Sequence, residues 1–306
     1  MSHRMMWGRK GSGLPYTPPL DAANAAAAYG IRKLRTDYNG PCVRVSDTAG
    51  FSGSTKDVGF DSNGFIDVSE LYSVSYLRTW YDHTGNGRDL VQNTVGRTPI
   101  MYRDNTSEWV NGKVAIKFLG DDFLSVPSST GIFKFLHDGT KCQVVSVNQF
   151  GVSADPGVLM VLLATCSFTG EVGVILSFRD AFGSNNAYQG AIYRGVGGSP
   201  TAEFVSADNA IPPNEQILFW NEFDGNNATA ADRIVGQVND AALISGNANT
   251  NAPSTSNTTR DLNVGRTPND SFSLTGFLQE LIVYDTDQSA QKTTLQNNLN
   301  DYFSIY

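Results

Sequence analysis

The segment Leu77-Arg78-Thr79-Trp80-Tyr81-Asp82-His83-Thr84-Gly85-Asn86-Gly87-Arg88-Asp89-Leu90 is the densest structural signal in the chain. In its first half, Trp80 lies two residues from Arg78 and from Asp82, which is strand spacing. Its second half contains a Gly-Asn-Gly turn, in which the glycines supply positive φ. We therefore predict a strand that buries Trp80, followed by a turn whose backbone amides bond to Asp82.

The same turn allows a second interpretation. Asp82, Thr84 and Asn86 occupy alternating positions followed by Gly87, as in the first half of a calcium-binding loop. Position twelve of that loop is Asn93, where an EF-hand needs a bidentate glutamate. The sequence therefore allows two interpretations of this segment: a purely structural turn, or a calcium site formed by Asp82, Asn86 and Asp89. Calcium is the one cofactor that we consider.

Outward from this segment, short runs with a period of two recur along the chain. The runs 42–45, 114–118 and 142–147 alternate, have 4–8 residues each and are bounded by Gly, Asn, Asp or Ser, which predicts strands. Turn signals every 8–20 residues are typical of a mainly β, two-sheet antiparallel sandwich. The predicted strands are 42–45, 114–118, 142–147, 158–164, 172–178, 191–194, 217–223, 234–238, 262–264 and 276–284.

Two peripheral helices are expected. Alanines over 22–34 favour a first helix, which Asp21 would cap. Asp287 or Ser289 would cap a second helix that ends near Tyr302. In that helix Leu295, Leu299 and Phe303 lie four apart on one face.

Residues 1–20 form an extended N-terminal arm in this interpretation, and residues 21–306 form a single domain. Gly and Pro break any regular element in the arm. Its apolar and basic side chains follow no period that could build a core, so we predict that it anchors the protein to an acidic neighbouring subunit. The anchoring residues are Met5, Met6, Trp7, Arg9 and Tyr16.

Charge and hydropathy exclude several classes of partner. Thirty acidic residues against 22 basic ones give a net charge of −8, which argues against nucleic acid. No apolar run reaches 18 residues, and no apolar core follows the basic N-terminus, so we expect neither membrane insertion nor a secretory signal. Cys42, Cys142 and Cys166 are expected to be buried thiols, with a single disulfide as the alternative.

The candidate sugar-contacting residues are Trp220, Glu222 and Asp224. Glycoside hydrolysis needs two carboxyls beside the scissile bond, and residues two apart on a strand share a face. A third carboxyl of the Glu-x-Asp-x-x-Glu type is missing, because position 227 is Asn. The alternative is that both carboxylates face solvent while an aromatic neighbour fills the core. We predict no catalysis, and at most glycan binding, by these residues.

Several segments together resemble a known module. Ala28-Tyr29-Gly30-Ile31-Arg32-Lys33-Leu34-Arg35, then Gly40-Pro41-Cys42-Val43-Arg44-Val45, then Trp80-Tyr81-Asp82-His83-Thr84-Gly85-Asn86-Gly87 occur in this order. The order resembles a module of bacteriophage structural proteins that is similar to the N-terminal part of family 54 α-L-arabinofuranosidases. The stretch from Phe272 to Asp285 resembles the closing strands of concanavalin/laminin-G-like sandwiches.

The resemblance implies a concanavalin-like jelly roll in a phage virion. The expected function is a head-decoration, head-fibre or tail-associated subunit, made in the host cytoplasm. Its partners would be other virion proteins, copies of itself and surface glycans. The alternative is a carbohydrate-binding or glycoside-hydrolase module that acts on host or plant polysaccharide. The pair of adjacent cysteines found in family 54 α-L-arabinofuranosidases is absent from this sequence, and the catalytic nucleophile of those enzymes cannot be assigned to any residue of it.

Overall fold

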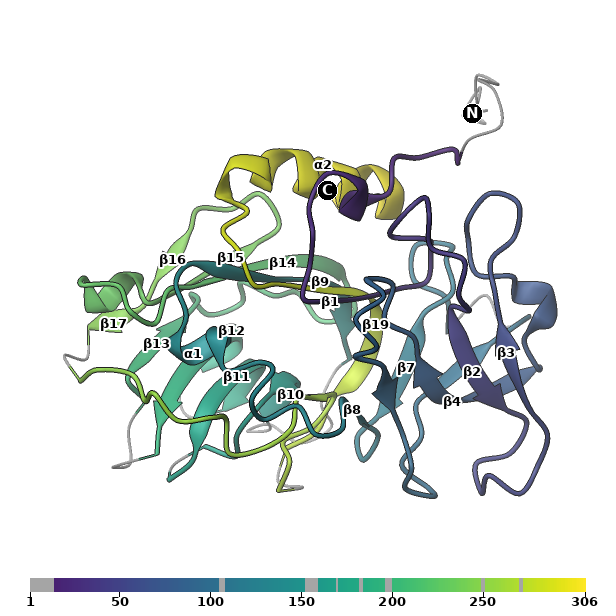
Figure 1. The fold of residues 1–306 in the computed structure, drawn as a ribbon, viewed down its shortest axis with the longest axis horizontal. Coiled ribbons are helices and arrows are strands. Elements are labelled where there is room, and N and C mark those ends of the chain that lie inside the picture. The colour runs from purple at the N-terminus through teal and green to yellow at the C-terminus, as the bar shows by residue number, and fades with distance from the viewer. Residues whose placement is uncertain are drawn as a thin grey trace.

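A computed structural model describes residues 14–104, 108–151, 159–168, 170–181, 184–195, 200–248, 251–269 and 272–306. The predicted mainly β sandwich is confirmed: antiparallel strands form a nearly closed sheet, and one long helix lies on its outside (Figure 1). No helix among the described residues is long and apolar enough to cross a bilayer.

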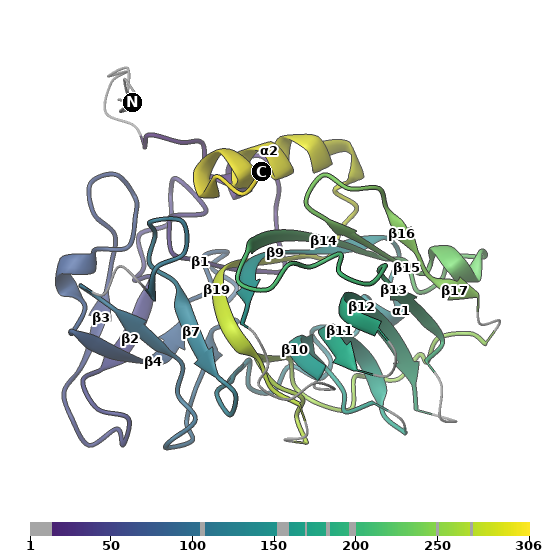
Figure 2. The ribbon, with the colours of Figure 1, turned by 180° about the vertical axis from the view of Figure 1, so that it is seen from behind.

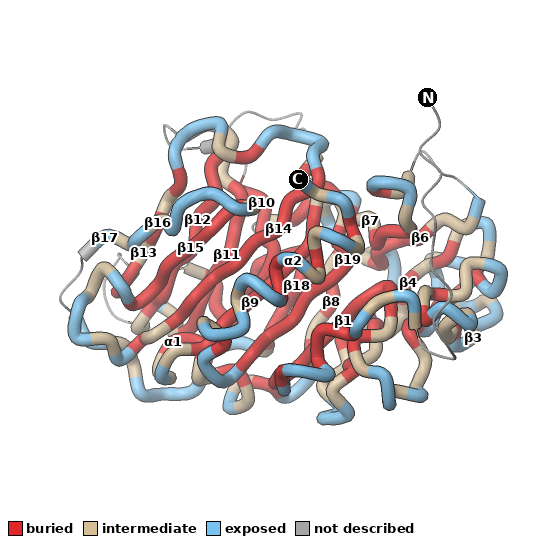
Figure 3. Tube along the Cα trace, turned by 90° about the horizontal axis from the view of Figure 1, so that it is seen from above, coloured by how far each residue is buried: buried red, intermediate tan, exposed pale blue. Residues whose placement is uncertain are grey.

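The upper layer of the sandwich consists of neighbouring strands β1, β19, β9, β14 and β15. Every residue of β14 is buried, because the lower layer covers one face and α2 crosses the other (Figures 1 and 3). The bounds are β1 Ala27–Gly30, β9 Cys142–Phe150, β14 Gln216–Phe223, β15 Ile234–Val238 and β19 Thr275–Tyr284.

The lower layer is built around β10, β11, β12 and β13, with β18 beside β10 and β17 beside β13 (Figure 2). Between the layers the ring of Phe150 stacks on Phe178 at 4.8 Å. Tyr188 likewise stacks on Phe219, with ring centroids 3.7 Å apart. The bounds are β10 Leu159–Ala164, β11 Val172–Ala181, β12 Ser184–Arg194, β13 Ala202–Val205, β16 Ile244–Ser245, β17 Asn247–Ala248 and β18 Asn263–Val264.

The N-terminal strands extend the sandwich at one end. β3, β2, β4, β6 and β7 lie side by side, and β7 joins β19 of the upper layer. The bounds are β2 Val43–Ser46, β3 Thr55–Val58, β4 Val74–Trp80, β5 Leu90–Val91, β6 Ile100–Tyr102, β7 Ile116–Leu119 and β8 Leu124–Ser125. The helices are α1 Phe135–Asp138 and α2 Lys292–Phe303, with 3-10 turns at η1 Pro19–Asp21, η2 Val68–Glu70, η4 Ala230–Asp232 and η5 Ser289–Gln291.

The helix expected over 22–34 is wrong, since the alanines form β1. Backbone groups of this segment bond to β19 on one edge and to the 82–88 turn on the other. These tertiary bonds outweigh a helix propensity of well under about 1 kcal/mol per residue. Asp21 accepts a bond from the Thr36 amide at 2.8 Å instead of capping a helix. The second helix is confirmed as α2, but the predicted cap is wrong: Gln291 stands at the N-cap without a side-chain bond, and Asp287 accepts bonds from Ser289 in the preceding turn.

The three cysteines are free and buried, as the sequence predicts, so the alternative of one disulfide falls away. Burial raises the pKa of each thiol well above its usual value. They act as small apolar side chains in the sandwich.

Candidate functional site

The turn after β4 holds the N-terminal end of β1 in place. Trp80 is fully buried, as predicted, and donates its indole N–H to the Gly30 carbonyl at 3.3 Å. Asp82 is also buried, and its carboxylate accepts bonds from the backbone amides of Ala28, Thr84 and Arg88 at 3.0, 3.0 and 3.2 Å. The prediction that Asp82 binds turn amides is therefore confirmed.

The residues considered for calcium are engaged in the same turn. Asp89 accepts a bond from the Asp82 amide at 2.9 Å, and Asn86 donates to the Ala26 carbonyl at 3.0 Å. No cluster of three His, Cys, Asp or Glu side chains suited to a metal occurs among the described residues. The backbone bonds explain the turn without a cation, and calcium binding stays a prediction from the sequence.

Replacement of Asp82 by alanine is expected to lower the free energy of unfolding by about 1–3 kcal/mol, because buried amides lose their acceptor. Asp82→Asn keeps one acceptor oxygen and should lose less. Urea unfolding of the two variants measures the difference. Equal stability of Asp82→Ala and the wild type would contradict the assignment of the turn.

Trp220 and Glu222 share a face of β14, as expected, but α2 covers that face. Trp220 is fully buried and donates its indole N–H to Glu222 at 3.0 Å. The Glu222 carboxylate also pairs with Lys141 at 3.0 Å and Lys292 at 3.6 Å. Asp224 lies beyond the strand end and accepts a bond from Asn227 at 3.0 Å. This cluster fastens the start of α2 to the sheet and leaves Trp220 no open face for a sugar.

The predicted anchoring residues Met5, Met6, Trp7 and Arg9 lie outside the described residues. Tyr16 is described, and it packs on its own chain: its ring stacks on Phe65 at 5.7 Å, and its hydroxyl donates to the Lys33 and Gly64 carbonyls. The start of the chain is thus fixed to the domain from about residue 14 onward.

A hairpin between β6 and β7 separates two depressions on the surface. Val110 and Lys113 exchange both backbone bonds, at 2.9 and 3.0 Å, and Asn111 and Gly112 take positive φ at the tip. This is the two-residue turn that an Asn-Gly pair favours. The side chain of Trp109, which precedes the hairpin, lines both depressions and is half-buried. We call the two depressions together the Trp109 groove.

One half of the Trp109 groove is aromatic. It has a volume of about 320 Å³, within the range usual for ligand pockets. Phe65 and Tyr302 pack at 5.4 Å between ring centroids, and both line it with Trp109. The other lining residues are Ile31, Asp61, Ile66, Val68, Gly112, Lys113 and Val114.

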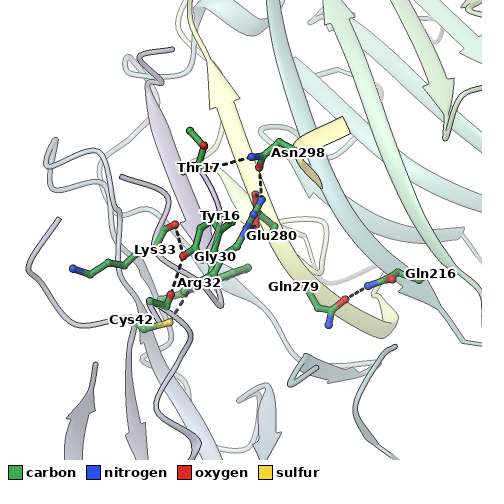
Figure 4. A network of polar contacts seen from close by, with 12 residues as sticks. Tyr16, Thr17, Gly30, Arg32, Lys33, Cys42, Gln216, Gln279, Glu280 and Asn298 are labelled. Atoms are coloured by element: carbon green, nitrogen blue, oxygen red, sulfur yellow. Dashed lines mark hydrogen bonds and ion pairs between the residues drawn. The ribbon is translucent and has the colours of Figure 1, made fainter. Parts of the chain in front are cut away.

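The other half of the groove is rich in amide side chains. It has a volume of about 460 Å³, and its lining includes the amide side chains of Asn111, Gln149, Asn214 and Gln216 and the carboxylate residue Glu215, beside Trp109. Asn111 donates to Gln216 at 2.6 Å. Gln216 in turn donates to Gln279 of β19 (Figure 4). Gln279 donates to the Val114 carbonyl at 3.1 Å, which ties the hairpin to the sheet.

A buried ion pair, Arg32–Glu280, lies next to the aromatic half of the groove. Arg32 donates to Glu280 through Nε at 2.9 Å and Nη2 at 3.2 Å, and also to Asn298 of α2 at 2.9 Å (Figure 4). The guanidinium lies 4.3 Å from the Tyr302 ring centroid. Burial raises the pKa of Glu280, although Arg32 opposes that shift. The pair therefore connects β19 and α2 at the point where Tyr302 faces the groove.

Solved structures share this architecture. A family 54 α-L-arabinofuranosidase soaked with a cyclic sulfate inhibitor matches 90% of this chain, with a TM-score of 0.61 and 12% identity. An arabinofuranosidase complexed with arabinofuranosyl-α-1,2-xylobiose matches 92% of it, with a TM-score of 0.56 and 14% identity. The likeness lies in the fold. The chain spans 62–63% of those proteins, no family model matches it, and no curated protein does.

Sequence patterns did not reveal the Trp109 groove. Its residues come from distant parts of the chain, namely residue 31, the segments 61–68 and 109–114, residue 149, and the segments 214–216 and 302–305. The Asn-Gly pair after Trp109 signals a hairpin, which would have placed Trp109 beside a tight turn. Which aromatic residues gather around it follows only from the folded chain.

Proposed function

We propose that this protein is a carbohydrate-binding domain that holds a saccharide in the Trp109 groove. The observation that carries the proposal is the half-buried Trp109, with aromatic rings on one side and amide side chains on the other. A sugar ring has C–H faces that pack on aromatic side chains and hydroxyl edges that need donors and acceptors. The groove offers both within reach of one indole ring.

The fold supports the same proposal. The structural neighbours are glycoside hydrolases, and one of them is complexed with an arabinofuranosyl xylobiose. Arabinofuranosyl oligosaccharides are therefore the first ligands to test. These structural neighbours give no support to a role in a virion. The virion location and the anchoring arm therefore remain predictions from the sequence. Mass spectrometry of purified phage particles tests them.

We propose binding without hydrolysis. The carboxylate candidate from the sequence, Glu222, is held by Trp220, Lys141 and Lys292 under α2, away from the groove. Asp61 lines the aromatic half and Glu215 the amide half, so among the described residues neither half brings two carboxyls together. A catalytic carboxyl must reach the scissile bond. We expect no sugar release from arabinoxylan, and no difference between the wild type and Glu222→Gln. Release that disappears in Glu222→Gln would contradict this proposal.

Replacement of Trp109 by alanine is expected to weaken saccharide binding at least tenfold, because aromatic residues at the centre of a site commonly contribute about 2 kcal/mol or more. A glycan array identifies the ligand, and calorimetry measures the affinity. Tyr81→Ala is the matched control, since Tyr81 is a half-buried aromatic residue that lines neither half of the groove. Equal binding by Trp109→Ala and Tyr81→Ala would contradict the location of the site.

A further inference from the structure

We infer that the aromatic half of the Trp109 groove selects an acidic saccharide, one that carries a carboxylate, through Lys113. The inference rests on the proposed function and adds the chemical class of the ligand. Its basis is an ammonium group in a ligand-sized aromatic depression whose positive charge the protein leaves without a carboxylate partner.

The side chain of Lys113 lines the aromatic half and is half-buried. Its ammonium lies 5.0 Å from the Tyr302 ring centroid. Among the described residues, no carboxylate comes within ion-pair distance of Lys113, whereas Lys117 on the following strand pairs with Glu108 at 2.6 Å. Burial and the neighbouring Arg32 lower the pKa of Lys113, as expected for a cation without an anionic partner.

Two other charged side chains lie at or near the depression, and each has hydrogen-bond partners within the protein. Asp61 lines it too, but its carboxylate accepts bonds from the Asn63 and Phe65 amides, both at 2.9 Å, within its own loop. Arg32 lies behind the aromatic rings, and Glu280 compensates its charge. Lys113 is therefore the cation that an incoming carboxylate would meet.

The hairpin fixes the backbone of Lys113 before any ligand binds. Its N–H and C=O both pair with Val110, and Gln279 donates to its carbonyl at 3.4 Å. A carboxylate on a ring packed beside Trp109 or Tyr302 could accept a charge-assisted bond from this ammonium. The aromatic wall would bind the ring, and Lys113 would distinguish acidic sugars from neutral ones.

The test compares an oligosaccharide that contains uronic acid with the same oligosaccharide after reduction of its carboxyl groups. Calorimetry at fixed salt should show about tenfold tighter binding of the acidic form by the wild type. Lys113→Met should bind both forms with the affinity of the neutral one. Lys33→Met removes the same charge from a half-buried lysine outside the groove, and should keep the preference.

The outcomes separate the two proposals. Equal binding of both forms by the wild type, lost in Trp109→Ala, would overturn the role of Lys113 and keep the carbohydrate site. A preference that survives in Lys113→Met or disappears in Lys33→Met would also overturn it, because the selection would then come from elsewhere. Binding of neither form, with other glycans bound in the groove, would overturn the acidic class alone. Absence of binding to every glycan would overturn the proposed function.

Discussion

Replacement of Glu280 by glutamine is expected to lower the free energy of unfolding by about 3–5 kcal/mol, because it leaves a buried cation without its counter-charge. Arg32 and Glu280 are both almost completely buried, with exposed fractions of 0% and 1%. An arginine cannot lose its proton in a protein, so the uncompensated charge persists. From α2, the guanidinium would keep the side-chain oxygen of Asn298 and the rings of Tyr302 and Phe303 as contacts, and none of these carries a negative charge.

The converse substitution, Arg32→Met, should cost less. Without Arg32, the buried Glu280 can take up a proton and become neutral, since burial already raises its pKa. The loss caused by Arg32→Met should therefore shrink as the pH falls, while that caused by Glu280→Gln should not. Urea unfolding of both variants at pH 7 and pH 5 provides the comparison. If Arg32→Met lost the same free energy of unfolding at pH 7 and at pH 5, the pair would not behave as a buried ion pair.

Wild-type stability is expected to fall by about 5 kcal/mol in acid because of His83, and replacement of His83 by phenylalanine is expected to abolish this loss. His83 is fully buried, stacks on Tyr38 at 4.5 Å, and has no hydrogen-bond partner for either ring nitrogen. Burial, and to a lesser extent Lys33, lower its pKa from 6.5 to about 3. The folded protein thus holds His83 neutral in a range where the unfolded chain protonates it.

The sign of this effect follows from the lowered pKa. Above about pH 6.5 the His83 ring is neutral in both the folded and the unfolded state, so His83 adds no pH dependence to the stability there. As the pH falls from there toward 3, the unfolded state binds one more proton, so stability decreases by about 1.4 kcal/mol per pH unit. The carboxylates and His137 titrate in both proteins. The difference between wild type and His83→Phe therefore isolates the His83 contribution, and identical slopes would contradict its burial as a neutral ring.

Many strands of the sandwich were predictable because their signal is local, although β3, β6 and β13 coincide with none of the predicted runs. β15 begins and ends where the alternation predicts, and β9, β10, β11, β14 and β19 differ only at their ends or continue further. β10 and β14 are buried on both faces, and their signal is a short apolar run bounded by turn residues. The turn at Asp82 was predictable for a related reason, since its donors and acceptor lie within seven residues, apart from Ala28.

The rest depended on contacts between distant segments. The alanines of β1 show no strand pattern, and only β19 and the 82–88 turn impose an extended backbone on them. Alternation placed Trp220 and Glu222 on one face correctly, but it could not reveal that α2, some seventy residues later, covers that face. The groove has the same origin, because Trp109, Phe65 and Tyr302 have no relation in sequence.

The measurement that tests the carbohydrate site most directly is a two-dimensional NMR titration of the ¹⁵N-labelled protein with the saccharide that binds. The chain has four tryptophans, so their indole N–H signals can be followed separately. Trp80 and Trp220 are fully buried, whereas Trp109 lines the groove. We expect the signals of the Trp109 indole and of the Asn111, Gly112 and Lys113 amides to shift. A shift of the Trp220 indole while the Trp109 signals stay in place would contradict a binding site in the Trp109 groove.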